Sequence, residues 1–179
     1  MNHNDILTFW FEELTPGQRF AKDAALDNAI RSRFGNVLQA ATRCELFAWR
    51  GSPEGRLAEI VVLDQFSRNV YRNSPCAFAQ DAQALVLAQE LVASGQDRSL
   101  LLAQRSFAYM PYMHSESVLM HAQAVALFRQ PGMEETLRFE LQHQAIIDRF
   151  GRYPHRNALL GRTSSAQELA FLSEPGSSF

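Results

Sequence analysis

The sequence predicts an all-α protein, arranged as a helical bundle or a short stack of helix pairs. Alanine and leucine are abundant along the 179 residues, whereas valine, isoleucine and threonine are sparse, which favours helix over strand. Apolar residues repeat at helical spacing in successive segments separated by proline, glycine or serine. No low-complexity linker divides the chain. We therefore expect one helical domain over 1–179, with a core of about 5–173 and a frayed tail at 175–179.

Start and stop signals place the helices in order. We expect helices at about 4–14, 23–41, 53–69, 77–93, 99–109, 115–129 and 134–150, and a last one after 165. Thr15-Pro16-Gly17 ends the first helix. Ser52 suits the N-cap and Pro53 the first position of the third helix. Ser165 and Glu168 have the spacing of a capping box at the start of the last one.

The same kinds of residue divide the second half of the chain. Ser94-Gly95 ends the alanine-rich helix, and Pro111 is expected to stop the next one. Ser115 and Glu116 then begin another helix. His114 is therefore expected at a helix N-terminus, whose partial positive charge favours a neutral imidazole.

Composition and charge exclude several function classes. The formal net charge is −2, so no overall field favours nucleic acid or an anionic membrane. The N-terminus lacks a basic segment and no apolar run is long enough to span a bilayer, so we expect a cytoplasmic protein. Cys44 and Cys76 form no zinc-binding spacing and are expected to be free thiols.

The stretch 143–164 carries more polar chemistry than a helix end needs. It holds four arginines and two histidines: Arg149, Arg152, Arg156, Arg162, His143 and His155. A helix C-terminus attracts cations, so capping explains part of this cluster. A planar guanidinium also binds carboxylate or phosphate through two parallel hydrogen bonds, so the cluster indicates an anion site.

Two further places hold polar residues among apolar ones. Asp64 and Arg68 are four residues apart and can pair on one helix face next to Asn69, although a surface ion pair is the simpler alternative. His114 and Glu116 lie close together at the expected helix N-terminus, where free N–H groups bind anions. Capping explains Glu116 but leaves His114 unexplained.

A metal site is not predicted. Glu140 and His143 have the Glu-x-x-His spacing of carboxylate-bridged metal bundles, and His121 lies on the preceding helix. Those bundles use two such pairs, whereas this chain has one, so a helix-surface contact is the better interpretation. Nucleotide-binding and hydrolase motifs are also missing, and we expect no cofactor.

Three segments together resemble the bacterial DUF924 family, a domain of unknown function. They are LDQFSRNVYR, FAYMPYMHSES and HQAIIDRFGRYPHRNALLGRTS, and the resemblance extends from about Ile6 to Leu172. Ser67 stands where proline is common in the family. The resemblance implies an all-helical fold similar to tetratricopeptide-repeat proteins. It implies no established activity.

Our leading hypothesis is that the polar residues converge on one pocket for a small anionic metabolite. Three would be catalytic, by histidine acid–base chemistry: His114, His155 and Asp64. Six would bind the ligand: Arg68, Asn69, Glu116, His143, Arg152 and Arg156. The alternative is a tetratricopeptide-like module without catalytic activity that binds a peptide or protein partner, with the polar residues joining helices. Nucleic acid and membrane are not expected as partners.

Two sets of physical properties follow from this interpretation. Both His114 and His155 are expected to titrate below the usual value of about 6.5 unless Asp64 or Glu116 pairs with them, the second because Arg152 and Arg156 flank it. Six apolar residues are expected in the core: Leu63, Phe66, Phe107, Ile146, Ile147 and Phe150.

Overall fold

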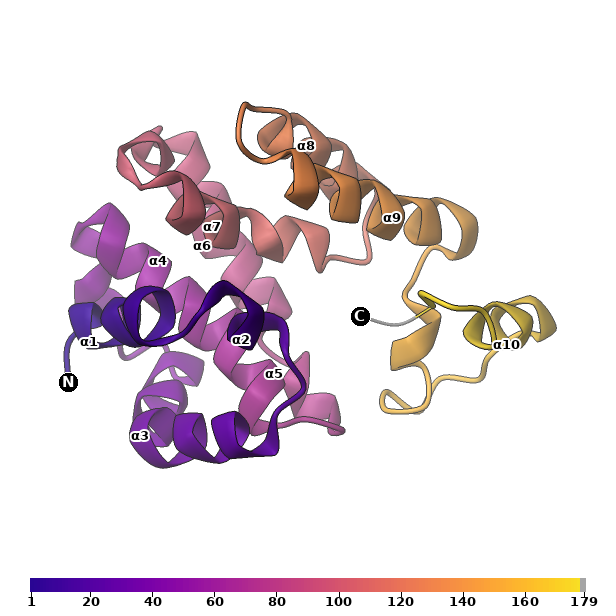
Figure 1. Ribbon diagram of the computed structural model, residues 1–179, viewed down its shortest axis with the longest axis horizontal. Helices are drawn as coiled ribbons and strands as arrows, with labels where there is room; N and C mark the ends of the chain where they lie inside the picture. Colours follow the sequence, from indigo (N-terminus) through magenta and orange to yellow (C-terminus); the bar gives the residue numbers. More distant parts are fainter. Residues whose placement is uncertain (178–179) are drawn as a thin grey trace.

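The chain folds into helices joined by short turns, which confirms the predicted all-α class. The computed structural model describes residues 1–177, and within them every regular element is helical. The α-helices of Figure 1 are α1 (His3–Leu7), α2 (Pro16–Phe20), α3 (Ala24–Thr42), α4 (Pro53–Val61), α5 (Ser67–Val70), α6 (Asp81–Ala93), α7 (Leu102–Met113), α8 (Val118–Phe128), α9 (Glu134–Phe150) and α10 (Ala166–Leu172). π-Helical segments occupy Thr8–Glu13 and Val62–Phe66. Short 3-10 turns occupy Phe47–Gly51, Pro75–Ala77, Gln96–Ser99 and Pro154–Arg156.

Sequential packing organises most of the molecule. Helix α4 packs against α1, α6 and α7, and from α6 onward each helix packs against the next as far as α9. Figure 1 shows α10 at the far end, on the C-terminal side of the long helix α9. Within the described residues, no helix combines the length and the apolar character needed to cross a membrane.

Two hydrophobic clusters form the interior. The larger one draws its buried side chains from residues 6–133 and includes Leu63, Phe66 and Phe107, as predicted. The smaller one contains Ile146, Ile147 and Tyr153. Phe150 is only partly buried, so its predicted core position is wrong. The arginine-rich end of α9 accounts for this, because the guanidinium of Arg149 lies over the Phe150 ring at 4.6 Å and that face stays near solvent.

Capping follows the sequence at several helix ends. Ser52 accepts from the backbone N–H of Gly55, and Ser165 with Glu168 forms the predicted capping box. At the N-terminus the cap of α1 is Asn2, since Asn2 and Asp5 satisfy each other's backbone N–H groups. The segment Thr15-Pro16-Gly17 ends the first helical segment and also begins the short helix α2, whose N-cap is Thr15.

The described part of the tail contacts the end of α10. Ser177 is buried and its hydroxyl donates to the carbonyl of Leu172 at 3.1 Å. Residues 178 and 179 of the predicted frayed tail lie outside the described residues.

Pro111 does not stop α7, contrary to prediction. The helix continues to Met113, because Tyr112 and Met113 pack into the main core and this burial offsets the one backbone hydrogen bond that proline removes. The next helix, α8, begins only at Val118, with Ser117 at its N-cap. His114 is therefore the C-cap of α7 and not part of a helix N-terminus.

A π-helical turn joins α4 to α5 within one continuous helical run. All five of its residues, Val62–Phe66, are buried. The wider turn of a π-helix changes the direction of the side chains that follow it, and such turns occur often at functional sites. Here it carries both Phe66 and the carboxylate of Asp64 into the interior, where neither is accessible to solvent.

Candidate functional site

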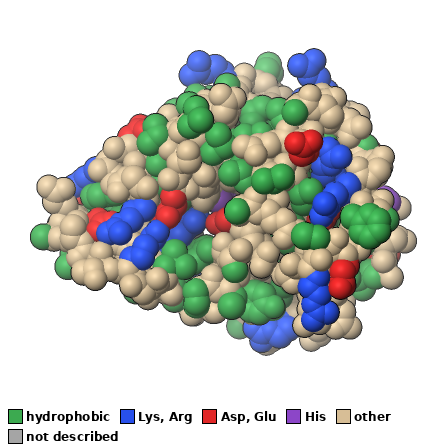
Figure 2. Space-filling view, turned by 180° about the vertical axis from the view of Figure 1, so that it is seen from behind, with side chains coloured by type: hydrophobic (Ala, Val, Ile, Leu, Met, Phe, Trp, Pro, Cys, Tyr) green, Lys and Arg blue, Asp and Glu red, His purple; other side chains and the backbone are tan. Residues whose placement is uncertain are grey.

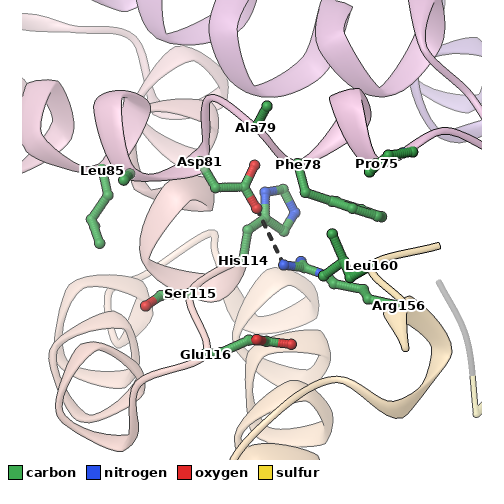
Figure 3. Close-up of a pocket in the computed structure, with 11 residues that line it drawn as sticks. Pro75, Phe78, Ala79, Asp81, Leu85, His114, Ser115, Glu116, Arg156 and Leu160 are labelled. Atoms are coloured by element: carbon green, nitrogen blue, oxygen red, sulfur yellow. Dashed lines mark hydrogen bonds and ion pairs between the residues drawn. The ribbon is translucent and has the colours of Figure 1, made fainter. Parts of the chain in front are cut away.

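A cavity of about 520 Å³ lies where α6, the α7–α8 junction and the segment after α9 meet. Figure 2 shows a hollow where the C-terminal part meets the rest of the molecule, with basic and acidic side chains around it and a histidine inside it. The polar lining residues are Asp81, His114, Ser115, Glu116 and Arg156. The apolar ones are Pro75, Phe78, Ala79, Ala82, Leu85 and Leu160 (Figure 3).

A carboxylate behind the cavity orients the histidine on its wall. Asp64 Oδ1 lies 2.7 Å from His114 Nδ1 and 3.0 Å from Arg68 Nη1. The amide of Gln65 donates to Asp64 Oδ2 at 2.5 Å. Burial alone would raise the pKa of the Asp64 carboxyl, but Arg68 and His114 hold it well below its usual range. Asp64 is therefore ionised, and His114 Nδ1 carries the proton between them.

The imidazole of His114 is neutral at pH 7. Burial lowers its pKa, Arg68 lowers it further, and Asp64 only partly opposes them. The sequence predicted a lowered pKa only for a histidine at a helix N-terminus without a paired carboxylate. His114 instead caps a helix C-terminus and pairs with Asp64, and burial is the main cause that lowers its pKa. With Nδ1–H donated to Asp64, the lone pair is on Nε2. No donor within residues 1–177 occupies that atom.

Asp81 links the two arginines at the cavity. Arg68 donates to both Asp81 oxygens at 3.0 Å, and Arg156 Nη1 donates to Oδ2 at 3.2 Å, the contact drawn in Figure 3. Arg68 also contacts Asp64, so one guanidinium connects the two carboxylates of the site. The carboxylates raise the pKa of Arg68 despite the opposing effect of its burial.

Arg156 is held between two aromatic rings. Its guanidinium carbon lies 4.6 Å from the ring centre of Phe78 and 4.5 Å from that of Tyr153, and only 6% of the residue is exposed. Burial lowers the pKa of Arg156, and the nearby charge of Arg68 adds to this effect. Its Nε is buried and has no hydrogen-bond acceptor among the described residues.

Glu116 is paired before any ligand arrives. Arg162 donates to its two oxygens at 2.6 and 2.9 Å, and the backbone N–H of Tyr153 donates to Oε1 at 2.8 Å. Burial would raise the pKa of Glu116, but Arg162 and this N–H lower it overall. Glu116 therefore fixes the 153–162 segment against the α7–α8 junction.

Two more of the predicted residues, His143 and His155, surround Tyr153. Their ring centres lie 5.8 and 5.5 Å from that of Tyr153, whose hydroxyl donates to the Met113 carbonyl. His143 Nδ1 also donates to the carbonyl of Phe139 at 2.8 Å. Burial is the main cause that lowers the pKa of His143 to about 3 and that of His155 to about 4. The predicted decrease at His155 is thus confirmed, with burial ahead of Arg156 as its cause.

Glu140 and His143, the Glu-x-x-His pair of α9, have different hydrogen-bond partners. Glu140 contacts His121 Nδ1 at 2.7 Å, with both side chains fully buried, whereas His143 bonds to its own helix. His121 Nε2–H donates to the Ser115 carbonyl at 2.9 Å. Burial raises the pKa of Glu140, and the hydrogen bond to His121 opposes this effect.

The family model described as "Bacterial protein of unknown function (DUF924)" matches residues 6–176. The chain belongs to the DUF924 family. Its structure is similar to that of a protein of unknown function from Agrobacterium tumefaciens, with a TM-score of 0.91 and 36% identity over 96% of each chain. No curated protein matches the chain with significance.

The three DUF924 motifs meet at the cavity. The first supplies Asp64 and Arg68 from the π-helical turn and α5, the second His114 from the end of α7, and the third Arg156 from the turn after α9. Asp81 lies outside these motifs and was missed.

Two predicted residues of this DUF924 protein lie at other junctions. Asn69 donates to Asp27 of α3 at 2.8 Å, where Arg72 also pairs with that carboxylate. Arg152 donates to both oxygens of Glu168 in α10 at 2.7 and 2.9 Å. The expected convergence therefore does not extend to Asn69 and Arg152, because nearer carboxylates on adjacent helices hold their side chains.

Proposed function

We propose that the cavity binds a small anionic molecule and that His114 acts on it as a general base. One observation carries the proposal. A neutral imidazole held by Asp64 and a guanidinium with an unused donor, that of Arg156, line the same cavity. A cation that positions an anion beside a base is what proton abstraction requires.

Arg156 is the arginine in the cavity lining, and it has capacity for an additional acceptor. Asp81 accepts two hydrogen bonds from Arg68 and only one, longer bond from Arg156. The Nε of Arg156 has no acceptor within residues 1–177. A buried donor without an acceptor costs about 1–3 kcal/mol. An anion that accepts from Arg156 would remove this cost, which favours its binding.

His114 suits the role of base better than His155, the other predicted candidate. His155 has a pKa of about 4, too low for efficient proton abstraction at neutral pH. The Nε2 lone pair of His114 is free of donors from residues 1–177, and the imidazole is 16% exposed. A bound anion would raise the pKa of His114 towards working pH, because negative charge stabilises the imidazolium.

Thermal stability in the presence of anions tests the proposal. We expect acetate and phosphate to raise the melting temperature saturably, by roughly 5–11 °C at about 100 times Kd. Arg156→Gln should abolish the increase. Arg152→Gln is the matched control, because Arg152 pairs with Glu168 away from the cavity. Equal increases in wild type, Arg156→Gln and the control would refute an anion site at Arg156.

The tetratricopeptide-like interaction module is the second candidate, and it predicts a different result. If Asp64, Arg68 and Arg156 only join helices, small anions should leave the melting temperature unchanged in all variants. The carboxylates already paired with these arginines fit such a role. The unpaired Nε of Arg156 is the observation that favours the ligand site.

A further inference from the structure

The cavity has an apolar side as well as a polar one. Phe78, Ala82 and Leu85 come from the start of α6 and the turn before it, and Leu160 faces them from the segment after α9. Figure 3 shows Phe78 and Leu160 close to the Arg156 side chain. At about 520 Å³ the cavity is within the range of sites for molecules much larger than acetate or phosphate. A ligand that fills it needs an apolar part next to its charge.

The unused edge of Arg156 indicates which charged group the ligand carries. Elsewhere in this chain, Arg50, Arg72 and Arg152 each hold a carboxylate through Nε and Nη2. In Arg156 the described residues leave both of these atoms without an acceptor, and only Nη1 is engaged, by Asp81. This fork of two parallel N–H donors matches a planar carboxylate.

Charge also favours a monoanion. Asp81 and Glu116 line the same cavity as Arg156, and each is already paired with an arginine. A phosphate dianion would place two negative charges near both carboxylates, whereas a carboxylate places one. The like-charge repulsion is therefore smaller for a carboxylate.

We infer that the ligand is an amphipathic carboxylate. Its carboxylate accepts from the Nε–Nη2 edge of Arg156, and its hydrocarbon part lies against Phe78, Leu85 and Leu160. The inference rests on the proposed anion site and adds the class of molecule that this site selects. His114 lines the same cavity that holds the bound molecule.

Calorimetric titration with straight-chain carboxylates from acetate to octanoate tests the class. Each added methylene that is buried should lower Kd by about fourfold until the cavity is filled. Hexanol and hexylamine should bind far more weakly than hexanoate, and hexyl phosphate should bind more weakly than heptanoate. Arg156→Gln should remove binding of the whole series.

Variants of the apolar wall separate chain-length selection from anion binding. Leu160→Asn should flatten the dependence on chain length while acetate binding persists, and Leu169→Asn is the control because Leu169 is exposed on α10. Circular dichroism establishes that both variants fold. Arg156-dependent anion binding that does not vary with chain length would overturn this inference and leave the proposed function standing. Tighter binding of hexyl phosphate than of heptanoate would overturn the carboxylate. Absence of anion binding throughout would overturn both proposals.

Discussion

Asp64→Asn removes the charge at the centre of the site and leaves the shape of the side chain. Asp64 is fully buried, with His114 Nδ1 at 2.7 Å and Arg68 Nη1 at 3.0 Å from one oxygen. Removing one partner of a buried ion pair costs about 3–5 kcal/mol, because the other charge stays buried. Asparagine retains one acceptor oxygen and Arg68 retains Asp81, so we expect a loss of about 3 kcal/mol. The melting temperature should fall by about 6–12 °C.

Urea denaturation at neutral pH measures this loss directly. Glu13→Gln is the control, because it removes a carboxylate whose pairing with Arg33 is exposed to solvent and should hardly change stability. A loss for Asp64→Asn no larger than that of the control would refute the claim that Asp64 is a buried, ionised partner.

The same variant has a defined dependence on pH. The pKa of Asp64 is lower in the folded protein than its unfolded value of about 3.9, so the carboxylate stabilises the fold above that pH. This contribution disappears as the pH falls through the folded pKa. The difference in unfolding free energy between wild type and Asp64→Asn should therefore shrink below about pH 4. Measurement in a His114→Gln background keeps the imidazole from adding its own titration. A constant difference down to about pH 3 would contradict the reasoning.

Three other predictions concern buried groups. Proton NMR should show no titration of His143 or His155 above about pH 5, and normal titration of either would refute its burial. The neutral forms of these two histidines stabilise the fold above the unfolded pKa of about 6.5, and this stabilisation decreases as the pH falls below that value. Phe66→Ala should cost about 3–5 kcal/mol in urea denaturation and Phe150→Ala clearly less, since only Phe66 is fully buried; equal losses would contradict the assignment of the core. Glu140→Ala should cost about 3–5 kcal/mol because it leaves a buried imidazole without its partner, whereas a loss below about 1 kcal/mol would show that the pair is dispensable.

Local signals in the sequence were sufficient for most helix boundaries. Ser52 and Ser165 cap their helices as predicted, because a capping side chain needs only backbone groups two or three residues away. Pro111 misled the prediction because its effect depends on tertiary burial. The free energy gained by packing Tyr112 and Met113 in the core allows α7 to continue. The rule that proline ends a helix considers only neighbouring residues and leaves this contribution out.

The candidate site could be predicted only in part. Asp64, His114 and Arg156 stood out because they are polar residues in apolar or arginine-rich surroundings. Asp81 did not, because an acid in the first turn of a helix is explained by the helix dipole, and its partners are 13 and 75 residues away. Arg152 was assigned to the site from the arginine cluster, but pairing with Glu168 is a tertiary contact that the cluster does not reveal.

The pKa of His114, measured by proton NMR with and without a saturating anion, tests the central claim most directly. Without anion, burial and Arg68 should keep it below about 6.5. Hexanoate should raise it, because the bound carboxylate adds negative charge in the cavity that His114 lines, and Arg156→Gln should abolish the increase. A His114 pKa that hexanoate leaves unchanged in the wild type, or raises equally in Arg156→Gln, would contradict the account.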